Sequence, residues 1–285
     1  MLELDRVVKR LGDVVVCQEV TFTVRHGEVM GLAGAGATTV LRLAAGLLTP
    51  DGGTVRRAGA RVGYLPADGG LYPGMRVLDH LVYVARLHGA DVNEALRAAE
   101  IWAARSGLRH RRADRVRRLL PAERARLRLA AVLVCDPDSL VLDDPFTGLD
   151  EAGADLLAHA VRERAAAGAS VLVACDDVEV VERLCDRACV LHDGRVVADD
   201  GVAGLLASAR QELLVDAPHA PPGWAAALPG VTVLAVHNGL ARLALAPGAD
   251  DQAVLAAALA TGPVRGFTRV RPRLADLFGD VVTPG

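Results

Sequence analysis

The chain of 285 residues is 52% apolar and carries a formal net charge of −3 at pH 7. This length and composition predict one large domain with a full core and a smaller second domain. The near-neutral charge argues against a nucleic-acid binder, and no apolar run approaches the roughly 18 residues of a membrane span. The five cysteines form no CxxC pair, so we expect buried free thiols rather than a metal site. We therefore expect a soluble cytoplasmic protein.

The N-terminal part of the chain predicts a β-layer followed by a strand, a glycine-rich loop and a helix. Residues 1–30 alternate and turn like antiparallel strands, most clearly at 14–16 and 20–24. Residues 28–33 predict a buried strand, and residues 38–48 predict a helix. A strand, a glycine loop and a helix form the setting in which a phosphate-binding loop occurs.

The glycine-rich segment has the frame of a phosphate-binding loop but lacks its charge. Gly31, Gly36 and Thr38 fit the spacing G-x-x-x-x-G-K-[ST], and Ala37 stands in the place of the lysine. Such a loop wraps backbone N–H groups around phosphates, sends its lysine to the β and γ oxygens and places a hydroxyl on Mg²⁺. Alanine cannot supply that charge-assisted hydrogen bond, which is worth about 1.5–3 kcal/mol.

No other cation is expected to replace the lysine. Lys9 is the only lysine in the chain, and Arg42 lies one helical turn on, where a helix directs its side chains away from a ligand at its N-terminus. Three interpretations of the loop stay open: a structural turn that keeps glycine for close packing, a weak nucleotide site, and a working ATPase loop. The first is favoured.

Beyond the loop, the pattern indicates an α/β core with a helical insertion. A short strand is expected at 61–65, and helical periodicity runs from 77 to about 131. Residues 139–142 and 170–174 are apolar enough to be central parallel strands, separated by a helix over 152–167. This alternation predicts an α/β fold whose core sheet is mostly parallel.

A change in composition near residue 216 predicts a second domain. The proline-rich segment 216–223 reads as a linker. Beyond it come a hairpin over 231–245 with an Asn238-Gly239 turn, a helix at 250–260 and a returning strand at 264–270. The expected organisation is a main domain at 1–215 with a helical subdomain at about 72–135, a linker at 216–230 and a small α+β domain at 231–285.

Several intact motifs stand in a recognisable order: Gly27-Glu28, Thr38-Thr39, Gly63-Tyr64-Leu65-Pro66, Leu71-Tyr72-Pro73 and the segments 142–150, 182–187 and 194–197. In this order the chain resembles, over essentially its whole length, the ATP-binding subunit of an ABC transporter of the drug-exporter (ABC-2) type. The resemblance implies a P-loop NTPase-like ABC ATPase fold. That fold has a mostly parallel core sheet, an antiparallel β-layer and an inserted helical subdomain, here with a small α+β C-terminal extension.

Nearly every position that contacts nucleotide in the family has changed. By the resemblance, the vestigial nucleotide-binding positions are Leu11, Gly31, Gly34, Gly36, Ala37, Thr38, Thr39 and Ala67. Leu11 stands where the family stacks an aromatic residue on adenine, and Ala67 stands where a glutamine couples Mg²⁺ and the attacking water to the membrane partner. The approach from Glu28 to the Thr-Thr pair is also about three residues shorter than in the family. Either the strand or the loop is therefore cut short.

The catalytic and signature positions depart as well. The resemblance places the general base at Asp144, which is one methylene shorter than the family's glutamate. It places the γ-phosphate histidine at Asp176, where a carboxylate would repel phosphate. The degenerate signature is Leu120, Pro121 and Ala122, in which proline has no N–H and the other two residues add bulk.

Asp143 and Thr38 remain as weak Mg²⁺ candidates, since one supplies a carboxylate and the other a hydroxyl. Capping and salt bridges near the sheet edge are the alternative role of Asp143 and Asp144. No cofactor is expected to be held tightly, so ATP and Mg²⁺ would bind weakly if at all. Retention of Gly148, Leu149 and Asp150 indicates a dimer interface that is still used.

The resemblance implies a transmembrane permease as partner, a homodimer or heterodimer with another ATP-binding subunit, and a place at the inner face of the plasma membrane. A cluster of arginines is expected to be a solvated helical face and not a nucleic-acid patch, because aromatic residues are missing between them. A docking surface for a membrane subunit's cytoplasmic helix is its functional alternative. The cluster comprises Arg109, Arg111, Arg112, Arg115, Arg117 and Arg118.

The leading hypothesis is a catalytically dead ATP-binding subunit that acts through assembly. Its support is the loss of nucleotide contacts together with the retention of positions that carry the fold. The two alternatives are a functional exporter ATPase with an unusual site and a soluble regulatory or scaffold protein without a transporter. This sequence does not identify the transported substrate, because in this family the permease determines which substrate is transported.

Overall fold

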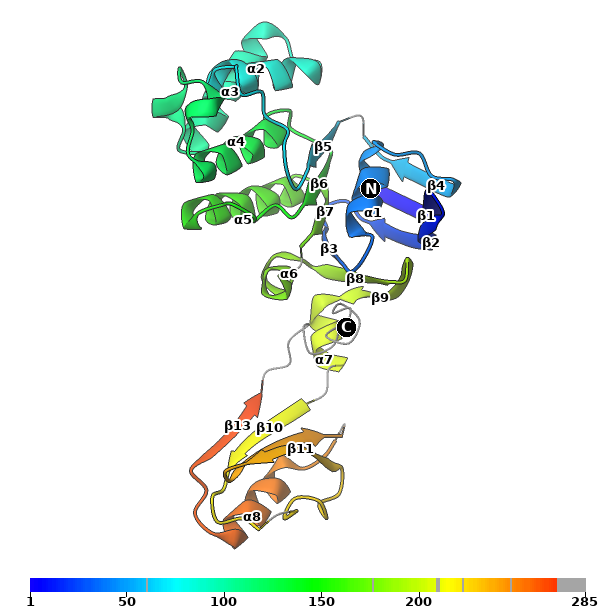
Figure 1. Cartoon of the computed structure of the whole chain (residues 1–285), viewed down its shortest axis with the longest axis vertical. Coiled ribbons are helices and arrows are strands. Elements are labelled where there is room, and N and C mark those ends of the chain that lie inside the picture. The colour runs from blue at the N-terminus through cyan, green and yellow to red at the C-terminus, as the bar shows by residue number, and fades with distance from the viewer. Residues whose placement is uncertain (60, 176, 209–210, 222, 247, 271–285) are drawn as a thin grey trace. The chain divides into compact units, whose positions relative to one another are not determined.

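The computed structural model describes residues 1–59, 61–175, 177–208, 211–221, 223–246 and 248–270 (Figure 1). These residues form two compact units that divide between Val202 and Ala203. Each unit has its own sheet and its own apolar core. The two units are therefore described one at a time.

The first unit is built on a six-stranded sheet in which the predicted parallel core is confirmed. All neighbouring strands are parallel except the last pair, β8 and β9. Strands β6 and β7 are buried along their whole length, as their continuous apolar runs require. The strand order is β5 (Val62–Leu65), β6 (Ser139–Asp143), β7 (Ser170–Ala174), β3 (Val29–Ala33), β8 (Arg187–His192) and β9 (Arg195–Gly201).

The predicted antiparallel layer is also confirmed, with β1 (Leu2–Leu11) between β2 (Val14–Val24) and β4 (Gly52–Arg57). The two strands expected at 14–16 and 20–24 are one continuous strand. Helix α1 (Ala37–Ala45) contributes the fully buried Leu41 to a core shared by this layer and the main sheet. Complete burial of a leucine contributes about 1.5–3 kcal/mol, so α1 is held firmly between the two layers.

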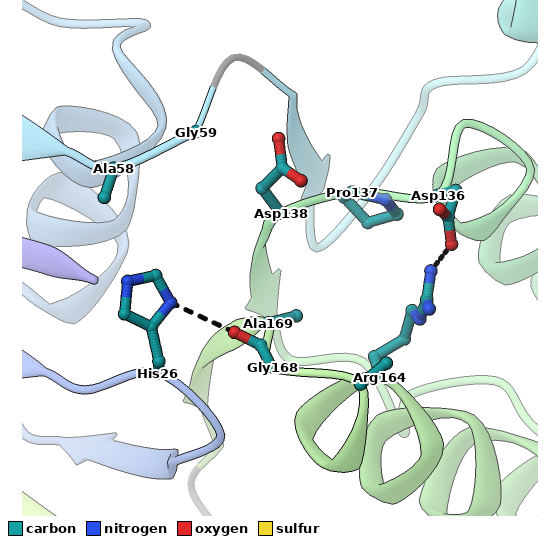
Figure 2. A pocket seen from close by; sticks show the side chains of 10 residues that line it. His26, Ala58, Gly59, Asp136, Pro137, Asp138, Arg164, Gly168 and Ala169 are labelled. Atoms are coloured by element: carbon teal, nitrogen blue, oxygen red, sulfur yellow. Dashed lines mark hydrogen bonds and ion pairs between the residues drawn. The ribbon is translucent and has the colours of Figure 1, made fainter.

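A cavity of about 320 Å³ lies where the β-layer meets the amino ends of β6 and β7 (Figure 2). Its polar groups already have partners within the chain. The His26 ring lies 3.1 Å from the Gly168 carbonyl, and Arg164 pairs with Asp136. Ligands of open α/β sheets bind outside the carboxyl ends of the strands, so this cavity is at the wrong end for a nucleotide.

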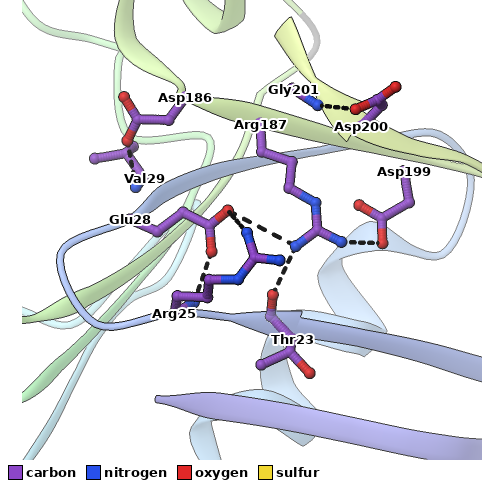
Figure 3. A network of polar contacts seen from close by, with 9 residues as sticks. All are labelled: Thr23, Arg25, Glu28, Val29, Asp186, Arg187, Asp199, Asp200 and Gly201. Carbon is purple, nitrogen blue, oxygen red and sulfur yellow. Dashed lines mark hydrogen bonds and ion pairs between the residues drawn. The ribbon is translucent and has the colours of Figure 1, made fainter. Parts of the chain in front are cut away.

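A network of charged groups ties the β-layer to the main sheet (Figure 3). The Arg187 guanidinium donates to the Thr23 carbonyl at 2.9 Å and to the Asp199 carboxylate at 2.5 Å. It also lies 3.7 Å from Glu28, whose carboxylate accepts from the Arg25 N–H at 2.6 Å. These contacts fix the chain where it enters β3, directly before the glycine-rich segment.

The remaining helices of the first unit follow the expected pattern, and Figure 1 shows α2, α3 and α4 grouped beyond the β5 edge of the sheet. Asp91 caps α3, since its carboxylate accepts from the N–H groups of Asn93 and Glu94 at 2.7 and 2.9 Å. The helices are α2 (Val77–Leu87), α3 (Val92–Arg105), the short 3₁₀ turns η1 (Arg109–Arg111) and η2 (Val116–Arg118), α4 (Pro121–Leu133), α5 (Glu151–Ala166) and α6 (Val178–Leu184).

The second unit begins at Ala203, within α7 (Val202–Ser208), and contains an antiparallel sheet in the order β11, β12, β10, β13. One buried core joins the sheet to α8. The predicted Asn-Gly hairpin is present, with φ of 50° at Asn238 and 82° at Gly239. The elements are β10 (Gln211–Asp216), β11 (Val231–His237), β12 (Leu240–Leu245), α8 (Asp251–Thr261) and β13 (Gly266–Val270).

This division differs from the predicted boundary at 216. Strand β10, which was assigned to the main domain, is an inner strand of the second sheet and pairs with β12 and β13. The segment expected to be a linker packs on the same unit, where Ala217 and Ala225 are only 2% and 1% exposed. Its prolines mark turns against a core, so composition misplaced the boundary. Residues 271–285 of the expected small domain lie outside the described residues.

All five cysteines are buried and unbridged, as expected. Burial raises the pKa of the Cys17 and Cys135 thiols to about 11 and that of the Cys185 and Cys189 thiols to about 12. Within the described part of the chain, no group of histidine, cysteine and acidic side chains is arranged to hold a metal, and no helix is long and apolar enough to cross a membrane.

His80 predicts a pH dependence of stability. Its side chain on α2 is fully buried, and neither ring nitrogen has a hydrogen-bond partner among the described residues. Burial lowers the pKa of His80, so the unfolded chain binds this proton more readily and stability is lost as the pH falls through the unfolded value of about 6.5. We expect His80→Leu to show a smaller fall in melting temperature between pH about 7.5 and about 5.5 than the unchanged protein. The control His88→Gln changes an exposed histidine, and an equal flattening in both variants would contradict this assignment.

Candidate functional site

The connection between β3 and α1 is a turn of three residues, 34–36. The Ala37 N–H donates to the Gly34 carbonyl at 3.2 Å, and the Val40 N–H donates to the Gly36 carbonyl at 3.1 Å. Strand β3 runs from Val29 to Ala33, and only the three residues 34–36 separate it from α1. A phosphate-binding loop directs its backbone N–H groups at the ligand, whereas the Ala37 N–H here is used within the turn.

Gly31 is not the first residue of a loop, which corrects the prediction. It lies inside β3, opposite Val173 on one side and Ala188 on the other. A Cβ atom here would stand 2.8 Å from the Val181 side chain and 3.1 Å from the Cys185 sulfur. Gly31 therefore allows α6 to pack on the sheet, so its fit to the phosphate-loop spacing does not place it in the loop.

Gly34 has a packing role too. Its φ is 102°, and a Cβ atom would stand 2.0 Å from the Leu191 carbonyl oxygen of β8. Gly36, at φ 94°, directly precedes α1. At the start of that helix Thr38 is exposed and Thr39 is buried. The glycines that suggested ligand binding thus serve a turn that lies against β8.

Asp143 ends β6 with both carboxylate oxygens facing donors of its own chain. Thr38 Oγ1 donates to Oδ1 at 3.1 Å, and the Tyr64 hydroxyl donates to Oδ2 at 3.4 Å. Arg42, expected to point away from the site, interacts electrostatically with the Tyr64 hydroxyl and with Asp143. Burial raises the pKa of Asp143 despite these partners. The Asp143 carboxylate, which would bind Mg²⁺, therefore already accepts hydrogen bonds from the chain.

Asp144 forms its hydrogen bonds with neighbouring parts of the chain. It adopts a left-handed φ of 44°, its N–H donates to the Ala174 carbonyl at 2.9 Å, and its carboxylate accepts from the Thr147 hydroxyl at 2.5 Å. Ala67 is exposed in the loop after β5, and Leu11 is 48% exposed at the end of β1. Asp176, another expected departure at this site, lies outside the described residues.

The degenerate signature opens α4, and the chain itself supplies the negative charge at this helix end. Leu120 is 63% exposed, and Pro121 and Ala122 begin the helix. Glu123 accepts from the Leu120 N–H at 2.8 Å and from the Arg111 guanidinium at 3.1 and 3.2 Å. Burial by itself would raise the pKa of Glu123, but these donors hold it below its usual value. A carboxylate of the chain itself thus lies at the start of α4, where a negative charge is favourable.

Sequence reasoning missed the role of Glu123, although a signal was present. A proline at the first helical position followed two residues later by glutamate is typical of a capped helix start. The expected interface residues lie on the adjoining surface. Gly148 is exposed, Leu149 is half-buried, and Asp150 caps α5 by accepting from the Gly153 N–H at 3.0 Å.

A second cavity, of about 340 Å³, separates the main sheet from the helical group. Arg128 of α4 crosses it, donates to the Pro66 carbonyl at 3.1 Å and interacts electrostatically with Asp68 and Asp144. The Nε atom of Arg128 is buried without a partner among the described residues. The walls are otherwise mostly apolar and include Leu47, Val62, Leu65, Pro66, Val84 and Val132.

Comparison with known proteins agrees with this architecture. Residues 17–147 match the family described as ABC transporter, and residues 207–282 match the C-terminal domain of DrrA1-3-like ATP-binding proteins. The chain is 33% identical over 208 residues to the uncharacterized ABC transporter ATP-binding protein YhaQ of Bacillus subtilis, covering 69% of this chain and 70% of that one. It is 35% identical over 221 residues to the Nod factor export ATP-binding protein I of Burkholderia lata, covering 73% of each.

Solved structures give the same fold. The ATP-binding subunit of an ABC transporter superposes with a TM-score of 0.68 at 25% identity, over 72% of this chain and 91% of that one. The dimeric bacterial ABC transporter cassette MJ0796 superposes with a TM-score of 0.64 at 20% identity, over 71% and 99%. The predicted ABC ATPase fold is therefore confirmed. With its two family matches and its relatives above 30% identity, the chain belongs to the ABC transporter ATP-binding proteins.

Proposed function

We propose that this chain is a subunit of an ABC exporter that has lost ATP hydrolysis and most ATP binding, and that it acts by assembly. The observation that carries the proposal is the three-residue turn between β3 and α1, which holds Ala37 at the lysine position. Phosphoryl-transfer enzymes draw most of their rate from groups that position and stabilise the phosphates. Here the lysine is missing, and the Ala37 N–H, the Asp143 carboxylate and the Leu120 N–H have partners within the chain.

Three contacts support the proposal independently of the missing lysine. Ala37 donates its N–H to the turn itself, Asp143 accepts from Thr38 and Tyr64, and Glu123 fills the start of α4. A buried polar group left without a partner costs about 1–3 kcal/mol. Because these groups already have partners within the chain, nucleotide binding would not remove a free-energy cost of this kind.

The proposed partners are a transmembrane permease and a second ATP-binding subunit, at the inner face of the plasma membrane. An export role is favoured because one relative is named a Nod factor export ATP-binding protein. The cavity crossed by Arg128 includes Pro66, directly before Ala67, where the family couples the site to its membrane partner. We therefore assign this apolar cavity to a cytoplasmic helix of the permease.

A functional exporter ATPase with an atypical site is the second candidate. One contact favours it, because the Thr38 hydroxyl still meets the Asp143 carboxylate as a Mg²⁺ site requires. The test is an ATPase assay on the purified full chain beside Asp143→Ala. We expect no turnover above background in either protein. Hydrolysis by the unchanged protein that Asp143→Ala abolishes would refute the proposal.

Restoring the lysine alone should not restore the site. We expect Ala37→Lys to gain no rise in melting temperature with about 1 mM Mg-ATP, because the three-residue turn still cannot wrap the phosphates. Ala35→Lys, which adds the same charge at an exposed neighbouring position, is the matched control. A rise of several degrees in Ala37→Lys but not in Ala35→Lys would show that charge alone had been limiting.

A further inference from the structure

We propose that an exposed surface of arginine and tyrosine side chains on the helical group binds the anionic headgroups of a lipid bilayer. Such binding goes beyond the proposed function, in which a permease holds the chain at the membrane. We call this region the arginine–tyrosine surface. It consists of Tyr72, Arg76, Tyr83, Arg115, Arg117, Arg118 and Leu120, which are all exposed.

The surface carries positive charge that the chain does not neutralise. Residues 105–128 contain ten arginines and only two acidic residues, in a chain whose net charge is −3. Both acidic side chains are already paired with Arg111, Asp114 at 2.9 Å and Glu123 at 3.1 Å. Arg115, Arg117 and Arg118 form no ion pair with the described part of the chain. Their charge is therefore open to an external anion.

The fold adds a further arginine from a distant segment. The Val116 N–H donates to the Met75 carbonyl at 2.9 Å, and the backbone places Arg76 directly opposite Arg115 in an antiparallel bridge. Like charges that face each other across such a pair are destabilising, and neither arginine has an ion-pair partner among the described residues. An anion lying over the bridge would remove that repulsion.

Aromatic side chains lie beside these arginines, although the sequence shows none between them. The Arg117 N–H donates to the Pro73 carbonyl at 3.1 Å, which brings Tyr72 next to the arginines. Tyr72 and Tyr83 are 49% and 37% exposed, and their rings meet edge to face at 5.5 Å between centroids. Tyrosine is favoured at membrane–water interfaces because its ring is apolar and its hydroxyl is polar.

A bilayer suits this combination better than a nucleic acid does. An anionic membrane presents many phosphates in one plane, so several arginines can be attracted at once, and Leu120, at 63% exposure, can enter its apolar part. A single-stranded nucleic acid would instead need free ring faces on which to stack its bases. Tyr72 already contacts the rings of both Tyr83 and His80.

The test is co-sedimentation of the full chain with lipid vesicles in the absence of nucleotide. We expect binding at about 50 mM NaCl to vesicles of phosphatidylcholine with about 30% phosphatidylglycerol, and none to vesicles of phosphatidylcholine alone. The bound protein should be released as NaCl rises to about 500 mM, because salt screens exposed charges.

Charge reversal makes the test specific to this surface. R115E/R117E should weaken binding to the anionic vesicles at least about tenfold, and Arg76→Gln should weaken it about fivefold. The matched control R183E/R195E reverses two exposed arginines on α6 and β9 and should change binding by less than about twofold. Circular dichroism verifies that each variant is folded, and the milder Arg76→Gln keeps the test decisive if R115E/R117E does not fold.

Four results would overturn the inference. They are no binding to anionic vesicles at low salt, equal binding to neutral vesicles, equal weakening by R115E/R117E and R183E/R195E, and tighter binding of a single-stranded oligonucleotide than of vesicles at the same surface. None of these measurements involves ATP, so each of the four results would leave the proposed function standing.

Discussion

The three-residue connection between β3 and α1 constrains the rest of the site. Both of its ends are fixed, since β3 pairs with β7 and β8 and α1 is buried between the two layers. The connection is closed by the hydrogen bond from the Ala37 N–H to the Gly34 carbonyl. The length of the connection decides how much backbone can face a phosphate, so the proposed loss of ATP binding rests on the turn as well as on Ala37.

Around this turn, several polar groups at the positions matched to the family's nucleotide contacts have partners inside the chain. Thr38 and Tyr64 donate to Asp143, and Thr147 donates to Asp144. Glu123 supplies a negative charge at the start of α4. An unpaired buried acceptor or donor would destabilise the chain, so these pairings let the fold exist without its ligand. Loss of nucleotide contacts and retention of the fold are therefore compatible.

The sequence was sufficient wherever periodicity and topology determine structure. The apolar runs at 139–142 and 170–174 are central strands, because only buried parallel strands tolerate such runs. It was insufficient where a feature depends on packing between distant segments. Gly31 is required by Val181 and Cys185 and not by a ligand, and the proline-rich segment after β10 folds against a core. The directions taken by Arg42 and Glu123 likewise depend on neighbours that the local pattern does not reveal.

Isothermal titration of Mg-ATP into the purified full chain tests the central claim most directly, namely that internal partners have replaced the nucleotide. The account predicts no saturable heat up to millimolar nucleotide, because the lysine is missing and the Ala37 N–H and the Asp143 carboxylate already have partners within the chain. A saturating isotherm of unit stoichiometry with a Kd tighter than about 1 mM, lost in Asp143→Ala, would contradict it.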